Sequence, residues 1–128
     1  MEENLDSLCQ KIIGAAIEVH KTMGPGLLEK IYLQCFCKEL DIRGLMYERE
    51  KQIPLVYKGQ LLDAGLRADL IVENLVIVEL KSVLDLNHVF EAQLISYLTL
   101  SGMPTGLLIN FNVPSLKDGI KRLFPIRK

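Results

Sequence analysis

Cysteine is scarce in this sequence, and the three cysteines that are present do not form a recognisable metal site. Cys9 stands alone, whereas Cys35 and Cys37 lie in a segment of helical character, where their side chains point in different directions. This spacing excludes the usual zinc sites and iron–sulfur clusters. An odd number of cysteines, in a chain whose start does not resemble a signal peptide, predicts reduced, packed thiols and a cytoplasmic protein.

Long apolar runs and a strong net charge are also missing. No run approaches the roughly 20 residues that span a bilayer, so no membrane segment is expected. The net charge of −1 and the pI of about 6.1 argue against tight, sequence-independent binding of long nucleic acid, which depends on Lys and Arg at phosphates. The 128 residues are 49% hydrophobic. This length suits one core, so residues 1–128 are expected to form a single domain.

The spacing of apolar residues predicts three helices, at about residues 4–21, 27–43 and 88–101. Gly24-Pro25-Gly26 ends the first helix and Gly44 ends the second, because glycine and proline interrupt helices. Asp85 or Asn87 can cap the third helix at its start, and Gly102-Met103-Pro104 ends it.

Alternating or continuously apolar segments predict six strands, at about residues 46–56, 61–64, 67–73, 75–81, 106–111 and 120–124. The first two strands are joined by a turn at Lys58-Gly59, and together with the next two they suggest a meander. The fifth strand is typical of one that is buried on both sides. The last alternates apolar and basic residues and is expected at an edge. Short edge strands are compatible with a homodimer.

Two neighbouring strands place charged residues within otherwise apolar sheet. Because side chains alternate between the faces of a strand, Arg67 and Asp69 share one face of the first strand, and Glu79 and Lys81 share one face of the second. A three-residue loop at 73–75 would place Asp69 opposite Glu79 and Arg67 opposite Lys81, about 5 Å apart. A two-residue loop would shift the register by one residue. Only the first register keeps the apolar residues together on one face.

These charged residues are compatible with two kinds of site. Asp69 and Glu79 could form a hard oxygen site for Mg²⁺ or Mn²⁺, and Lys81 could then activate a water or stabilise charge at a phosphorus centre. Together with Arg67, the same residues could instead form a cross-strand ion-pair cluster on a solvated sheet face. An unpaired carboxylate inside a sheet is costly, so either arrangement would explain why the charge is tolerated.

The sequence around these residues resembles a known nuclease superfamily. Ala68-Asp69 followed by Glu79-Leu80-Lys81 is similar to the motif of the PD-(D/E)XK nucleases. Gly26-Leu27-Leu28-Glu29-Lys30-Ile31-Tyr32 fits the Gly-x-x-Glu-x-x-Tyr signature of the small GxxExxY family within that superfamily. The likeness extends from about Ile12 to Leu123. It implies an α/β fold with a central mixed β-sheet flanked by helices, in the approximate order α-α-β-β-β-β-α-β-β.

The resemblance also implies a catalytic metal centre. Asp69 and Glu79 correspond to residues that bind Mg²⁺ or Mn²⁺, and Lys81 corresponds to the lysine that assists the chemistry. Glu29 would be the acidic residue that many members add to the metal site from the first part of the fold. From its position alone, Glu29 in the first turn of a helix would also be explained by the helix dipole.

Further residues correspond to substrate contacts. Gln93 and Tyr97 lie one helical turn apart and look like the Gln-x-x-x-Tyr pair of exonuclease-like branches, although Tyr97 alone could equally be a core ring. We also expect Arg67 to contact the substrate, which the resemblance implies is nucleic acid, with DNA expected. One position departs from the family, since Phe90 stands directly before Glu91-Ala92-Gln93, where relatives often have histidine.

The sequence therefore predicts a nuclease that hydrolyses phosphodiester bonds through a water activated by Mg²⁺ or Mn²⁺. Two alternatives stay open. The chain could be a non-catalytic module that binds nucleic acid or protein on a nuclease-like fold, or a structural domain whose ion pairs order the sheet. The complete set of Asp69, Glu79 and Lys81 favours retained chemistry, because a non-catalytic descendant has no need of all three.

Overall fold

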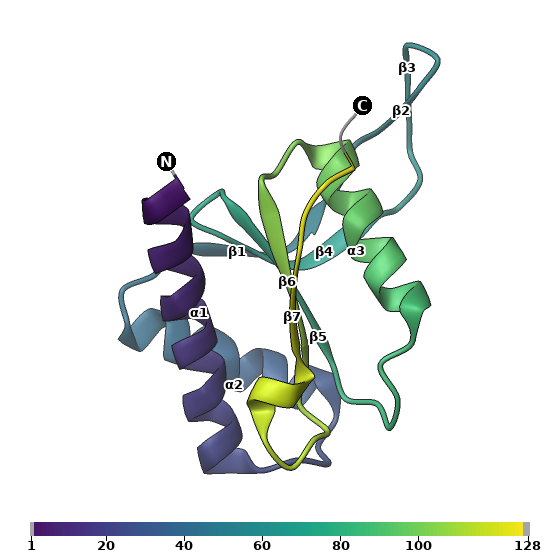
Figure 1. Cartoon of the computed structure of the whole chain (residues 1–128). Helices are drawn as coiled ribbons and strands as arrows, with labels where there is room; N and C mark the ends of the chain where they lie inside the picture. Colours follow the sequence, from purple (N-terminus) through teal and green to yellow (C-terminus); the bar gives the residue numbers. More distant parts are fainter. Residues whose placement is uncertain (1, 127–128) are drawn as a thin grey trace.

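Residues 2–126, the part of the chain that this computed structural model describes, contain three α-helices and a mixed β-sheet (Figure 1). In chain order the elements are α1 (Glu2–Met23), α2 (Glu29–Ile42), β1 (Tyr47–Gln52), β2 (Leu55–Tyr57), β3 (Gln60–Leu62), β4 (Arg67–Val72), β5 (Val76–Lys81), α3 (His88–Ser101), β6 (Thr105–Asn110), the 3₁₀ helix η1 (Leu116–Gly119) and β7 (Ile120–Leu123). The α/β class predicted from the sequence is confirmed. The predicted order differs in having one strand fewer before α3.

The main sheet has five strands in the order β1-β4-β5-β6-β7. Strands β5 and β6 are parallel, and the other neighbours are antiparallel. A parallel pair needs a crossover connection, and α3 supplies it. All residues of β6 are buried, which explains its continuously apolar sequence. The edge position predicted for β7 is correct.

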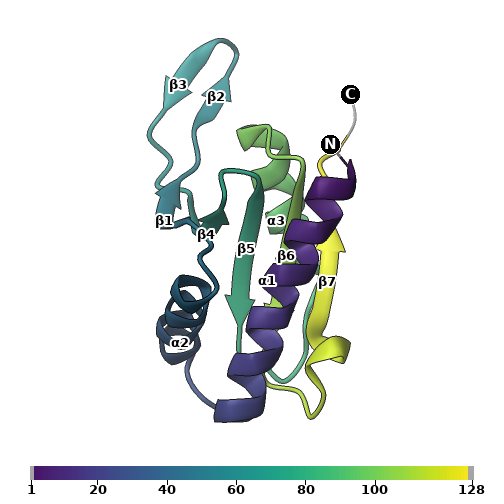
Figure 2. The same ribbon diagram turned by 90° about the vertical axis from the view of Figure 1, so that its left-hand side faces the viewer.

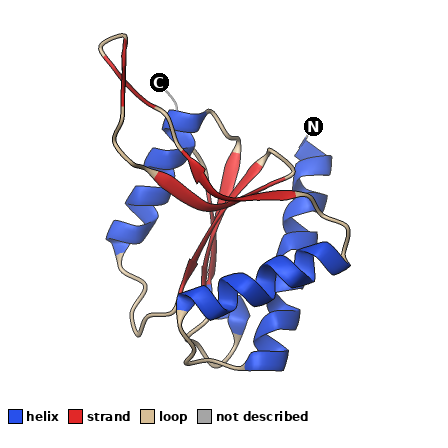
Figure 3. Cartoon of the chain, turned by 180° about the vertical axis from the view of Figure 1, so that it is seen from behind, coloured by secondary structure: helices blue, strands red, loops and turns tan. Residues whose placement is uncertain are grey.

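The helices divide between the two faces of the sheet, with α1 and α2 on one side and α3 on the other (Figure 3). Leu70 and Val72 of β4 pack into the core cluster that includes α1 and α2. Ile71 of β4 and Ile77 of β5 point the other way and pack with Leu94 of α3. The face that carries the charged residues is therefore partly covered by a helix, and it is not the open, solvated surface that a simple ion-pair cluster would occupy.

The long first strand and the meander predicted from the sequence are wrong. Strand β1 ends at Gln52, and β2 and β3 form a separate two-stranded sheet that projects from the body (Figures 1 and 2). The physical reason is Pro54, which has no N–H for the ladder, while the Ile53 amide donates to the Leu66 carbonyl and closes the base of the hairpin. The predicted turn at Lys58-Gly59 is confirmed, and both residues have positive φ.

The ends of α3 follow the sequence signals closely. The side chain of Asn87 accepts a hydrogen bond from the Val89 amide, and Gly102 ends the helix in the left-handed conformation at φ 75°. Of the two candidate caps, Asn87 is thus the one that is used. Helix α2 begins at Glu29, two residues later than predicted, because Leu28 is still extended and acts as the N-cap.

The three cysteines are free thiols, and two of them are buried. Burial raises the pKa of the Cys9 and Cys37 thiols, which makes them poor nucleophiles and agrees with a packing role. Among the helices within residues 2–126, none combines the length and the apolar character that crossing a membrane requires.

Candidate active site

The register between β4 and β5 brings Asp69 and Glu79 together. The two strands pair Val72 with Val76 and Leu70 with Val78, so the connecting loop spans residues 73–75, as one of the two predicted registers required. Continued by one residue, the same register sets Asp69 opposite Glu79. The alternation of apolar residues was therefore sufficient to select the correct pairing.

The carboxylates of Asp69 and Glu79 take the place of ordinary ladder bonds between the strands. The Asp69 amide donates to Oε1 of Glu79 at 3.2 Å, and the Leu80 amide donates to Oδ2 of Asp69 at 2.8 Å. Each acid thus accepts a main-chain N–H from the opposite strand. Because the strands fix both carboxylates through their own backbone, the two groups are held in place before any ligand binds.

Proximity of the two acids changes how they titrate. Burial of Glu79 and the neighbouring carboxylate of Asp69 raise the pKa of Glu79 to about 9, although Lys81 acts in the opposite direction. Burial and a neighbouring carboxylate therefore favour the protonated form of Glu79 near neutral pH. A divalent cation could replace that proton and allow both groups to ionise.

Lys81 extends from the same face of β5 toward α3. Its Nζ lies 4.6 Å from the centroid of the Phe90 ring, and the lysine side chain is partly buried. Within residues 2–126, Lys81 forms no ion pair with an acid. It is nevertheless close enough to Glu79 to affect that group's pKa.

Helix α3 brings two further predicted residues to the same centre. Nε2 of Gln93 donates to the hydroxyl of Tyr97 at 3.1 Å, which confirms that the two side chains share a helical face. Burial, and then the negative charge of Glu79, raise the pKa of Tyr97. Tyr97 is only 8% exposed, whereas Gln93 faces solvent. Tyr97 therefore lies close enough to Glu79 for that charge to affect its pKa, while Gln93 lies at the surface of α3.

Two of the predicted site residues form no ion pair with this group within residues 2–126. Glu29 is the first residue of α2, which packs on the opposite face of the sheet, and its exposed side chain lines a hollow together with Ser82, the residue after Lys81. Arg67 begins β4, pairs with Gln52 of β1 and is also exposed. In the part of the chain that the structure describes, no three His, Cys, Asp or Glu residues are arranged to hold one metal ion. Asp69 and Glu79 are thus the acids that converge.

The structure assigns a clear role to Tyr32, which the sequence reasoning treated only as part of a signature. Its hydroxyl donates to the Gly24 carbonyl and accepts from the Leu27 amide, and its ring stacks on Phe111 with centroids 4.3 Å apart. Tyr32 therefore fixes the loop that leads into α2 and sets the position of Glu29.

Asn110 is a second residue whose role the sequence did not reveal. It ends β6 beside Lys81, and its amide group makes hydrogen bonds to both the N–H and the carbonyl of Val83, at 3.1 and 3.0 Å. The side chain of Ser82 also donates to the Leu27 carbonyl. These bonds hold the segment that follows Lys81. The one signal in the sequence is that Asn110 is a polar residue at the end of a largely apolar strand.

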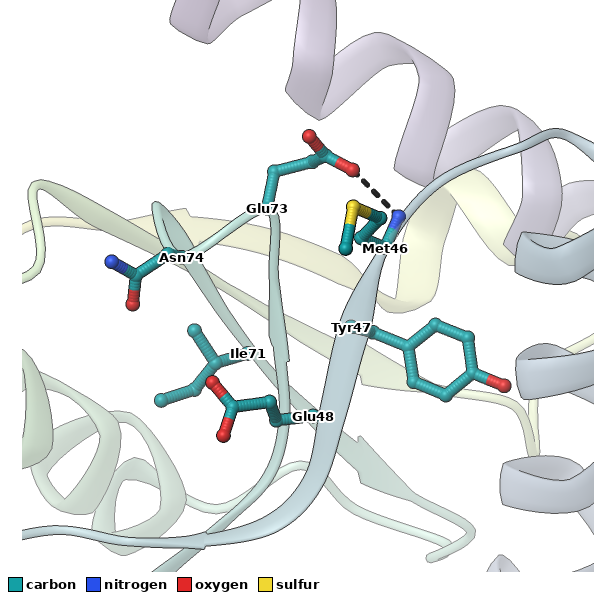
Figure 4. Close-up of a pocket in the computed structure, with 6 residues that line it drawn as sticks. All are labelled: Met46, Tyr47, Glu48, Ile71, Glu73 and Asn74. Atoms are coloured by element: carbon teal, nitrogen blue, oxygen red, sulfur yellow. Dashed lines mark hydrogen bonds between the residues drawn. The ribbon is translucent and has the colours of Figure 1, made fainter.

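One hollow in the surface lies away from the two acids and carries no comparable chemistry. It has a volume of about 260 Å³ at the turn end of β4 and β5, and it is lined by Met46, Tyr47, Glu48, Ile71, Glu73 and Asn74 (Figure 4). Its Glu73 carboxylate accepts a hydrogen bond from the Met46 amide at 2.6 Å. Asp69 lies toward the other end of β4. The candidate site is therefore identified by its converging charged groups and not by the shape of a hollow.

Comparison with known proteins gives one match. The family model described as the PD-(D/E)XK nuclease superfamily matches residues 6–123. Neither the curated proteins nor the solved structures contain a significant match to this chain. The family match covers both acid-bearing strands, Lys81 and all of α3. The narrower assignment to the GxxExxY family stays a prediction.

Proposed function

Because the chain belongs to the PD-(D/E)XK nuclease superfamily, we propose that it hydrolyses nucleic-acid phosphodiester bonds with the help of a divalent metal ion. The observation that carries the proposal is the pair of carboxylates on β4 and β5. Asp69 and Glu79 replace ladder bonds between the strands, and burial together with Asp69 raises the pKa of Glu79 to about 9. Such a pair favours a cation that would allow both acids to ionise.

The donor atoms suit Mg²⁺ or Mn²⁺. Both ions prefer carboxylate oxygens, and Mg²⁺ often uses one or two protein carboxylates, completing its shell with waters and substrate phosphate. Asp69 and Glu79 would hold the ion. When bound, it would supply a Lewis acid and a water of lowered pKa. Glu29 is proposed as an additional ligand on the family resemblance alone.

The remaining side chains have separate proposed tasks. Lys81 would stabilise the negative charge that develops at the phosphorus centre, since its ammonium is held on the same face as the two acids. Gln93 and Tyr97 would orient the substrate from α3, and the exposed Arg67 would contact a phosphate. DNA is the expected substrate, and the cytoplasm is the expected location.

The test is cleavage of labelled single-stranded and double-stranded DNA by the purified protein, with Mg²⁺, with Mn²⁺ and with EDTA. We expect metal-dependent cleavage that is lost in Asp69→Ala and in Lys81→Ala. Asp63→Ala and Lys58→Ala are matched controls, because these residues of the same charges are exposed in and beside the projecting hairpin. Cleavage that survives both site substitutions would reject the assigned centre.

A binding module without catalysis is the second candidate. One observation favours it, namely that only two acids converge among residues 2–126. Such a module would retain DNA in EDTA and release no cleavage product with either metal ion. A gel-shift assay run beside the cleavage assay separates the two functions.

A further inference from the structure

The position of the Lys81 ammonium is unusual for a cation beside two acids. In a partly buried site an ammonium normally pairs with a carboxylate, because the attraction is stronger there than in water. Lys81 and Glu79 are two residues apart on the same strand face, yet Nζ of Lys81 lies over the Phe90 ring, 4.6 Å from its centroid. The ring therefore takes the place that a carboxylate would otherwise fill.

The other acid near Phe90 is already engaged. Glu91, the next residue of α3, accepts a hydrogen bond from Lys121 at 2.9 Å and lies 3.5 Å from His88. The Glu91 carboxylate thus already interacts with Lys121 of β7 and with His88 of its own helix. The carboxylates of Asp69 and Glu79 accept main-chain amides instead of the ammonium. Phe90 is the group that holds Lys81 among these neighbours.

A neutral aromatic ring has a specific physical effect here. It attracts a cation through the negative charge on its face, but it does not use any carboxylate oxygen. We propose that Phe90 is a positioning residue that holds the Lys81 ammonium off the carboxylates of Asp69 and Glu79, and so leaves both acids free to bind a divalent cation. This inference depends on the proposed metal-dependent function of the same site.

The first test observes the contact directly. Protons on a carbon above an aromatic ring shift upfield, so the Cε protons of Lys81 should be shifted upfield in the NMR spectrum of the metal-free wild-type protein. We expect the shift to persist in Phe90→Tyr, which keeps a ring, and to disappear in Phe90→Leu. An unshifted Lys81 signal in the folded wild-type protein would overturn the proposal.

The second test measures metal affinity by calorimetry with Mn²⁺. In Phe90→Leu the released ammonium should pair with Asp69 or Glu79 and compete with the ion, which weakens Mn²⁺ binding by roughly threefold to tenfold. Phe90→Tyr should bind as the wild type does. Adding Lys81→Met to Phe90→Leu should restore the affinity, because the competing cation is then gone.

The projecting hairpin offers a matched control, since Nζ of Lys58 lies 5.4 Å from the centroid of the Tyr57 ring. Tyr57→Leu removes a comparable contact outside the site and should leave Mn²⁺ affinity unchanged. Unchanged affinity in Phe90→Leu, or no recovery in the double variant, would overturn the proposal. Wild-type protein that binds Mn²⁺ but cuts no nucleic acid would reject the nuclease function, and weaker Mn²⁺ binding by Phe90→Leu in the same preparation would still support the positioning role. Absence of Mn²⁺ binding would overturn both.

Discussion

The paired acids make stability depend on pH in a direction that can be worked out from the structure. A carboxyl group whose pKa is raised in the folded state binds its proton more tightly there than in the unfolded chain. The resulting stability is fully present below the unfolded pKa of 4.5 and is lost as the pH rises through about 9, the pKa of Glu79 in the folded protein. Without metal, the folded protein should therefore become less stable from pH 5 to pH 9.

Glu79→Gln is the perturbation that isolates this effect. Glutamine cannot ionise, yet its oxygen can still accept the hydrogen bond from the Asp69 amide. A pKa rise from 4.5 to about 9 would amount to at most roughly 6 kcal/mol, and because Glu79 is only partly buried and solvent screens its charge we expect about 1–3 kcal/mol to be measured. The variant should gain stability relative to the wild type by this amount between pH 5 and pH 9.

The assay is urea unfolding in EDTA at pH 5, 7 and 9, followed by circular dichroism because the sequence contains no tryptophan. Asp63→Asn, which removes an exposed carboxylate near the hairpin, controls for the loss of one charge. Parallel pH profiles for the wild type and Glu79→Gln would refute the view that Glu79 holds a proton near neutral pH.

Three further predictions follow from other contacts. Mn²⁺ should raise the melting temperature of the wild type more at pH 8.5 than at pH 6, because the ion replaces the proton on Glu79, and Glu79→Gln should lose this pH dependence; an equal rise at both pH values would contradict the exchange. Tyr32→Phe removes both hydrogen bonds of the buried hydroxyl and should cost about 1–3 kcal/mol in thermal unfolding, whereas an unchanged melting temperature would show that the loop does not depend on them. Replacing residues 54–65 by Asn-Gly should keep the circular dichroism spectrum and Mn²⁺ binding, since the base of the hairpin is already closed between Ile53 and Leu66; loss of the folded spectrum would show that the hairpin is required.

Features governed by local rules could be predicted from the sequence. The pairing of Asp69 with Glu79 follows from side-chain alternation and the length of one loop, and both are visible in the sequence. The bounds of α3 follow from its two caps, Asn87 and Gly102, which are also visible in the sequence. The sequence also contained the signal that divides the predicted first strand into β1 and β2, because Pro54 has no N–H to donate in a ladder. The prediction of one long strand gave Pro54 too little weight.

Contacts that depend on tertiary packing could not be predicted in this way. The position of Phe90 relative to Lys81 depends on the connection from β5 to α3, part of which is fixed by Asn110, a residue of a later strand. The role of Tyr32 depends on its hydrogen bond to Gly24, in the loop before α2, and on its stacking with Phe111, which is distant in sequence. Periodicity shows which face a side chain occupies, but it does not show which group from another element meets it.

The β4–β5 turn divides the site between two parts of the chain. Asp69 belongs to the part before the turn, while Glu79, Lys81, Phe90, Gln93 and Tyr97 all come after it. The turn itself, at Glu73-Asn74, is exposed, with both residues at positive φ. A chain cut there into two fragments would leave one acid on each piece, and neither piece could reproduce the carboxylate pair. Under the proposed metal-binding role, cation binding by the mixed fragments would report that the two strands had paired again.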